Sequence, residues 1–185
     1  MSDDPDPPSF DIALVVEDDD WLNLPMDASG QARLAALAAL RAAPDGQSLA
    51  AGRALSLVLA DDRLVQRLNR DFRGRDAPTN VLSFPNLGAD APPDLPGAEP
   101  AALGDVVLAR ETLLREAAAQ RKSPADHLAH LVVHGVLHLL GYDHERESDA
   151  RVMERLEVEV LADLGVADPY RNADSADVAV LEQVS

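Results

Sequence analysis

The 185-residue sequence contains no cysteine. Disulfides and thiolate metal sites are therefore excluded, and histidine and the carboxylates remain as possible metal ligands. The sequence also lacks any run of 18 apolar residues, and no basic segment followed by an apolar one opens it. We therefore expect neither a membrane-spanning nor an exported protein, and a cytoplasmic location fits best.

Basic residues are few: 16 lysines and arginines stand against 33 aspartates and glutamates, for a net charge of −17. This balance argues against a nucleic-acid partner at first sight, because a basic face is the usual footprint of such binding. The acids are concentrated at the ends, however, since residues 1–20 and 166–185 account for −11 of the total. Residues 63–75 hold five arginines against one aspartate. A nucleic-acid site is therefore possible only where these arginines gather.

All five histidines fall between residues 127 and 144. His134 and His138 are four residues apart, which places them on one helix face, about 40° apart around the axis and about 6 Å along it. Both imidazoles can then reach one ion at the roughly 2.0–2.1 Å that zinc prefers. Gly141 offers a left-handed position where the helix can end, so that the chain turns back and delivers His144 as a third ligand. Three neutral nitrogens leave an open position on a tetrahedral ion, as in catalytic sites.

The alternative is a helix whose buried or surface histidines bind nothing, and the clustering of all five histidines disfavours it. The spacing is that of the long metzincin zinc signature, but Gly135 stands where that signature has a glutamate. A peptidase needs this carboxylate to take a proton from the attacking water, so peptide hydrolysis is disfavoured. Three neutral ligands also preserve the full 2+ charge of the ion, which suits an anionic substrate such as a phosphodiester.

Four segments carry a resemblance to a known family: HGVLHLLGYDH at residues 134–144, NRDFRGRDAPTNVLSFP at 69–85, LGDVVL at 103–108 and GVADPY at 165–170. Together they resemble the bacterial rRNA-maturation factors known as the YbeY family of zinc endoribonucleases. The resemblance covers roughly residues 10–170. It implies a zinc-dependent endoribonuclease specific for single-stranded RNA, acting on the 3′ end of small-subunit rRNA and in ribosome quality control. It also implies partners among small-subunit proteins and a ribosome-assembly GTPase.

Arg73 is the candidate catalytic residue, because it matches a family position held to be important for RNA cleavage. A guanidinium binds a phosphate through two parallel hydrogen bonds and stabilises charge that develops in the transition state. The alternative is a surface or carboxylate-paired arginine. Asn80 and Ser83 lie in the same matched segment, where they either build a substrate cleft or simply form the turn.

Other candidates have weaker support. Arg67 and Arg70 follow one face of a helix, as either an ordinary solvated face or a surface that tracks phosphates. His130 precedes the first ligand by one helical turn and is a candidate for lining the cleft. Asp143 adjoins the third ligand and either orients a histidine or caps the turn. Asp105, at the start of a strand, is a candidate for orienting a ligand or acting as general base, although a structural role fits it better.

The pattern of elements predicts one α/β domain over residues 10–170, with a mixed, mostly parallel sheet of about four strands and about five helices. The resemblance implies the same fold, with a zincin-like histidine helix. The helix after Asp61 is expected to turn Leu64, Leu68 and Phe72 toward the core and to end at Gly74. We expect residues 1–9 to be a disordered acidic segment, 85–103 a proline-rich loop and 171–185 a flexible tail.

Two rival functions remain open. One is a metzincin-like peptidase, which the glycine at position 135 disfavours. The other is a non-catalytic assembly factor whose zinc only braces the fold, with a further side chain such as Asp143 closing the site. The sequence does not identify a general base.

Overall fold

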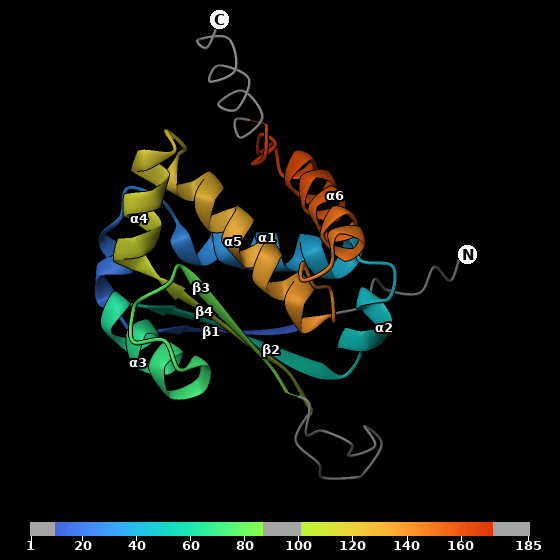
Figure 1. The fold of residues 1–185 in the computed structure, drawn as a ribbon, viewed down its shortest axis with the longest axis horizontal. Helices are drawn as coiled ribbons and strands as arrows, with labels where there is room; N and C mark the ends of the chain where they lie inside the picture. Colours follow the sequence, from blue (N-terminus) through green and yellow to red (C-terminus); the bar gives the residue numbers. More distant parts are fainter. Residues whose placement is uncertain (1–9, 87–100, 172–185) are drawn as a thin grey trace, which may run out of the picture.

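The computed structural model describes residues 10–86 and 101–171 (Figure 1). The predicted disordered segment 1–9, most of the proline-rich loop and most of the predicted tail lie outside the described residues. Within the described ranges, one four-stranded sheet has the order β1-β2-β4-β3. Its strands are β1 (Asp11–Val16), β2 (Arg53–Ala60), β3 (Val81–Pro85) and β4 (Ala101–Ala109). The first three members of that order are parallel and β3 is antiparallel to β4, so the predicted mixed, mostly parallel sheet is confirmed.

Six α-helices and one 3-10 helix accompany the sheet in the described residues. They are η1 (Asp19–Asn23), α1 (Ala28–Ala42), α2 (Gly46–Ala50), α3 (Asp62–Arg73), α4 (Arg110–Ala119), α5 (Pro124–Leu139) and α6 (Glu147–Asp163). The short η1 and α2 were not predicted, since a helix of about one turn carries no apolar period that could indicate it. In Figure 1, α1 and α5 cross one face of the sheet and α3 lies against the other.

Helix α3 begins and ends as its sequence predicts. Asp61 accepts a hydrogen bond from the backbone nitrogen of Leu64 at 2.8 Å, and Gly74 ends the helix with a φ of +68°. The prediction that Phe72 belongs to the core is wrong, because this side chain is 69% exposed. Each step of four residues advances about 40° around a helix, so a stripe that starts at Leu64 has left the sheet by the last turn. Phe72 instead packs edge-on against Phe84, with ring centroids 5.4 Å apart.

Helix α5 is the central helix and carries the histidines. Ser123 caps it by accepting a hydrogen bond from the backbone nitrogen of Asp126 at 3.0 Å. The helix packs against α1, β3 and β4. Gly135 lies against the sheet: a Cβ atom there would be 2.7 Å from a methyl carbon of Val106 and 3.1 Å from the hydroxyl oxygen of Ser83. The lack of a side chain at this position therefore brings the histidine helix directly onto the edge of the sheet.

No helix in residues 10–86 or 101–171 has both the length and the apolar character needed to cross a membrane.

Candidate metal centre

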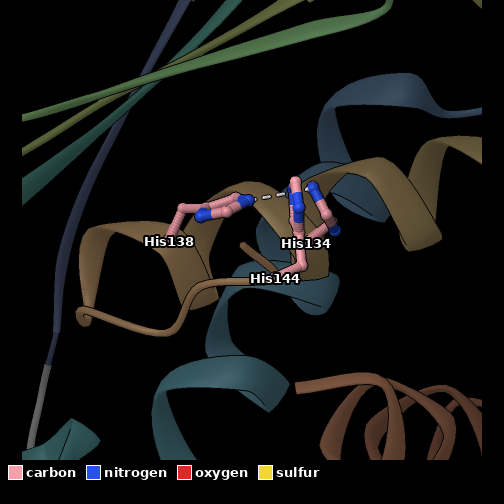
Figure 2. A group of neighbouring side chains, drawn as sticks. All are labelled: His134, His138 and His144. Carbon is pink, nitrogen blue, oxygen red and sulfur yellow. Dashed lines mark hydrogen bonds between the residues drawn. The ribbon is translucent and has the colours of Figure 1, made fainter. Parts of the chain in front are cut away.

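Three histidines converge at the end of α5 and in the turn after it (Figure 2). One ring nitrogen from each of His134, His138 and His144 lies within 4.8 Å of the other two. The Nε2 atoms of His134 and His138 are 3.1 Å apart. Two nitrogens bound at about 2.0–2.1 Å to a tetrahedral zinc ion would be separated by roughly 3.3–3.4 Å, so the two rings are already close to that arrangement.

The turn that delivers His144 depends on Gly141, whose φ of +91° lies in the region that favours glycine. Asp143 stabilises the same turn, because its Oδ1 accepts a hydrogen bond from the backbone nitrogen of His144 at 2.7 Å. The ring of His144 then lies nearly parallel to that of His134, with centroids 5.6 Å apart. The donor set is three imidazoles, which suits a divalent transition metal.

Burial lowers the pKa of His138, and the charges of the neighbouring His134 and His144 rings lower it further. A lowered pKa keeps this imidazole neutral near neutral pH. The neutral ring is the form that binds a metal, so His138 is in the form that a metal ligand requires.

A fully buried carboxylate lies behind the cluster. Glu157 on α6 accepts a hydrogen bond from His134 Nδ1 at 2.6 Å, and its side chain is 1% exposed. Burial raises the pKa of Glu157, but hydrogen bonds from His130, His134 and Tyr170 outweigh that effect and lower the pKa to about 2. An ionised carboxylate is only an acceptor, so Nδ1 of His134 is the donor in this contact, and Nε2 is the atom that faces His138.

Sequence reasoning missed Glu157 and considered Asp143 and Asp105 as the carboxylates that orient a ligand. A signal was present, because Glu157 occupies a place in the apolar stripe of α6, four residues after Met153 and four before Leu161, all of them buried. Charged residues are almost never fully buried unless they are paired. Asp105 is exposed on β4 and is not among the residues that line the cleft described next.

The three histidines line a cleft of about 980 Å³. The end of α3, the loop after it and β3 also line this cleft, and their lining residues include Arg73, Asn80 and Ser83. Arg73 is exposed and donates a hydrogen bond from Nη2 to the backbone oxygen of Ser83 at 3.1 Å. This bond holds the guanidinium beside the cleft, and within residues 10–86 and 101–171 its other N–H groups remain available for a ligand.

Asn80 and Ser83 also hold the structure together. Asn80 donates from Nδ2 to Glu116 at 2.9 Å, and its Oδ1 accepts from the backbone nitrogen of Val81 at 2.7 Å. Ser83 donates its hydroxyl to the backbone oxygen of Gly135 at 3.1 Å, which joins β3 to α5. Both residues therefore line the cleft while fixing its shape.

The remaining candidates lie away from the cleft. Arg67 and Arg70 are exposed on α3, and Arg70 forms an ion pair with Asp71 at 2.9 Å. Neither arginine lines the cleft. His130 lies behind His134, and its Nε2 is 3.2 Å from Oε2 of Glu157. The structure thus brings Arg73, Asn80 and Ser83 to the histidines and leaves Arg67, Arg70 and His130 outside.

Comparisons with known proteins identify the family of the chain. Residues 26–165 match the family model for the endoribonuclease YbeY. A protein named endoribonuclease YbeY in Rhodospirillum rubrum is 51% identical over 172 residues, which cover 90% of this chain and 86% of the relative. Its namesake in Azorhizobium caulinodans is 50% identical over 161 residues, covering 87% of this chain and 96% of the relative. The solution structure of TM1509 from Thermotoga maritima aligns at 22% identity over 83% of this chain and 91% of that chain, with a TM-score of 0.49, too low to support an argument.

The family match spans α1 to the end of α6 and therefore includes the histidine helix, the turn after it and Arg73. The chain belongs to the endoribonuclease YbeY family.

Proposed function

We propose that this protein is a zinc-dependent endoribonuclease that cleaves single-stranded RNA, with zinc bound by His134, His138 and His144. The observation that carries the proposal is the convergence of three imidazoles in a cleft that an arginine, Arg73, also lines. A dication and a guanidinium facing the same space fit a substrate with a phosphodiester backbone. The names of the relatives support RNA as that substrate.

When bound, zinc would supply a Lewis acid that polarises a phosphoryl oxygen and favours ionisation of an attacking water. The chain's own residues hold and orient the reacting groups. Arg73 donates to the non-bridging oxygens of the phosphate and stabilises the charge that develops on them. The hydrogen bond from Arg73 to Ser83 fixes the direction of the guanidinium before RNA arrives.

The peptidase alternative is disfavoured by the packing of α5. Position 135 faces the sheet, and even a Cβ atom there would approach a Val106 methyl to 2.7 Å. A glutamate could not occupy that position and also reach an attacking water. The bracing alternative requires a fourth protein ligand, whereas the metal-ligating group found in the described residues has three members. Asp143, which directly precedes His144, uses Oδ1 to bond the backbone of the turn.

The family resemblance also suggests the cellular substrate, location and partners of the protein. We propose a single catalytic domain over residues 10–170 that acts in the cytoplasm on the 3′ end of small-subunit rRNA and in ribosome quality control. Small-subunit proteins and a ribosome-assembly GTPase would be its partners. The acidic termini would then lie outside the catalytic domain.

The test compares RNA substrates and metal states on the purified full-length protein. A labelled single-stranded RNA and its duplex form are incubated with the zinc-loaded protein, the chelator-treated protein and the His138→Ala variant. We expect cleavage of the single strand by the zinc-loaded protein alone. Equal cleavage by His138→Ala would reject the proposed site, and a zinc-loaded protein that cuts neither RNA would favour the bracing role.

A further inference from the structure

Packing in the core does not explain why residue 157 is a glutamate. Glu157 is 0% exposed and lies between Met153 and Leu161 on the buried side of α6. An apolar side chain of similar volume would avoid the cost of desolvating a charge at this position. The carboxylate must therefore serve the groups that it contacts.

Glu157 joins three donors from two other parts of the chain. Its Oε1 accepts from His134 Nδ1 at 2.6 Å. Its Oε2 accepts from His130 Nε2 at 3.2 Å and from the hydroxyl group of Tyr170. Each carboxylate oxygen is thus engaged, and rotation of the carboxylate would break bonds on both sides. The hydrogen bond to His134 therefore has a fixed direction.

Tyr170 reaches Glu157 from the segment that follows α6. Gly165, with a φ of +75°, ends the helix and lets the chain turn back. Lys122 then donates to the backbone oxygen of Pro169 at 3.1 Å, which ties this segment to the connection between α4 and α5. The ring of Tyr170 packs edge-on against His130, with centroids 5.7 Å apart. The residues matched by the family model end at 165, so Tyr170 lies beyond them.

We propose that Glu157 is a positioning residue that sets the Nδ1–H tautomer and the ring orientation of His134 before metal binds, and that Tyr170 holds Glu157 in place. This inference rests on the proposed metal site. A histidine whose other nitrogen is held by a carboxylate is a better oriented and more basic ligand. The segment after α6 would then contribute to metal affinity without touching the ion.

The first experiment measures zinc affinity of the full-length protein by competition with a chromophoric chelator. Glutamine at position 157 preserves the volume but removes the charge and one acceptor oxygen. We expect Glu157→Gln to weaken zinc binding by about 10–100-fold. The matched control is Glu159→Gln, an exposed acid on the same helix, which should bind zinc as tightly as the wild type. Wild-type affinity in a folded Glu157→Gln protein would overturn the proposal.

Tyr170→Phe removes only the hydroxyl group. We expect a smaller loss of zinc affinity than for Glu157→Gln. The double variant should lose no more than Glu157→Gln alone, because Tyr170 acts through Glu157. Additive losses of zinc affinity in the double variant would show that Tyr170 does not act through Glu157. An unchanged zinc affinity in Tyr170→Phe would remove Tyr170 from the proposal.

The second experiment needs no variant, so it tests the proposed tautomer of His134 even if Glu157→Gln fails to fold. Nitrogen NMR of the imidazoles in the metal-free wild type reports which ring nitrogen carries the proton. We expect His134 to be protonated on Nδ1, and a proton on Nε2 would overturn the proposal. A wild type that binds no zinc would instead reject the proposed function, and the tautomer would still test the part played by Glu157.

Discussion

Helix α5 carries two carboxylate–histidine networks that are built from the same parts and end differently. In the N-terminal network, Glu116 accepts from His127 Nε2 at 2.8 Å and from Asn80 Nδ2 at 2.9 Å. In the C-terminal network, Glu157 accepts from His134 Nδ1 at 2.6 Å. The two histidines are seven residues, about two helical turns, apart on the same helix.

The two networks differ in the ring nitrogen that meets the carboxylate. His127 uses Nε2, and its Nδ1 is buried with no hydrogen-bond partner among the described residues. His134 uses Nδ1, so its Nε2 faces His138 at the cleft. The same pair of side-chain types therefore gives a buried structural hydrogen bond at His127 and an available metal ligand at His134. The lesson is that a histidine's function depends on which of its atoms the surrounding structure occupies.

Alanine substitutions should separate the two networks most strongly. We expect His134→Ala to reduce the zinc content from about one ion per chain to nearly none. His127→Ala should retain its zinc and lose about 2–4 kcal/mol of stability, because it leaves a cavity and removes one of the two hydrogen bonds to Glu116. Elemental analysis and chemical unfolding measure the two effects. Zinc retained by His134→Ala, or lost from a folded His127→Ala protein, would remove the distinction between the networks.

The cleft joins both networks, since Asn80 and His134 line it together with Arg73. We expect Arg73→Glu to lower RNA cleavage by about 10²–10³-fold, because a donor to the transition-state charge is replaced by a repelling carboxylate. Zinc content and melting temperature should stay near wild type, because Arg73 is exposed. Arg155→Glu, the same charge reversal at an exposed position on α6, serves as the control and should cleave normally. Unfolding of Arg73→Glu would instead assign Arg73 a structural role.

Acid should weaken the C-terminal network through Glu157. Burial raises the pKa of this group, but the hydrogen bonds from His130, His134 and Tyr170 lower it to about 2. Since the folded pKa lies below the unfolded value, ionised Glu157 stabilises the protein above about pH 4.5, and this stabilisation is lost as the pH falls toward 2. The shift corresponds to a free energy on the order of 3 kcal/mol.

Urea unfolding of the metal-free wild type and Glu157→Gln over this pH range measures the contribution. The free energies of unfolding should converge as the pH falls, since glutamine does not titrate. Two curves that remain parallel from pH 5 to pH 2 would show that the charge of Glu157 does not stabilise the fold.

The smallest expected effect concerns the arginines of α3, which belong to neither network. If Arg67 and Arg70 each contact one phosphate, replacing both by glutamine should flatten the log–log dependence of RNA affinity on salt by about 1.4. Cleavage at saturating RNA should change less, because neither side chain lines the cleft. RNA binding is measured over a salt series for both proteins. An identical slope would make this surface an ordinary solvated face.

The candidate metal ligands could be predicted from sequence because their geometry is local. One helix and one turn set the relative positions of His134, His138 and His144, and the glycine after the helix indicates the turn. Caps such as Ser123 and Asp61 were predictable for the same reason. The fold class followed from the alternation of strands and helices.

The support behind the site could not be predicted in this way. Glu157 lies 23 residues after His134, and their contact depends on how α6 packs on α5. The sequence instead favours an acid beside a ligand, Asp143, which bonds the backbone of the turn. The exposure of Phe72 likewise depends on how α3 is rotated against the sheet. Both outcomes are set by tertiary packing.

The most direct test of the proposed metal site is a zinc titration of the metal-stripped protein, with cleavage of single-stranded RNA as the readout. We expect no cleavage without metal, a linear recovery up to one zinc per chain and no further gain beyond it. His144→Ala, which removes the ligand contributed by the turn, should not recover under the same titration. Full cleavage by the stripped protein, or normal recovery by His144→Ala, would contradict the claim that three histidines hold the catalytic ion.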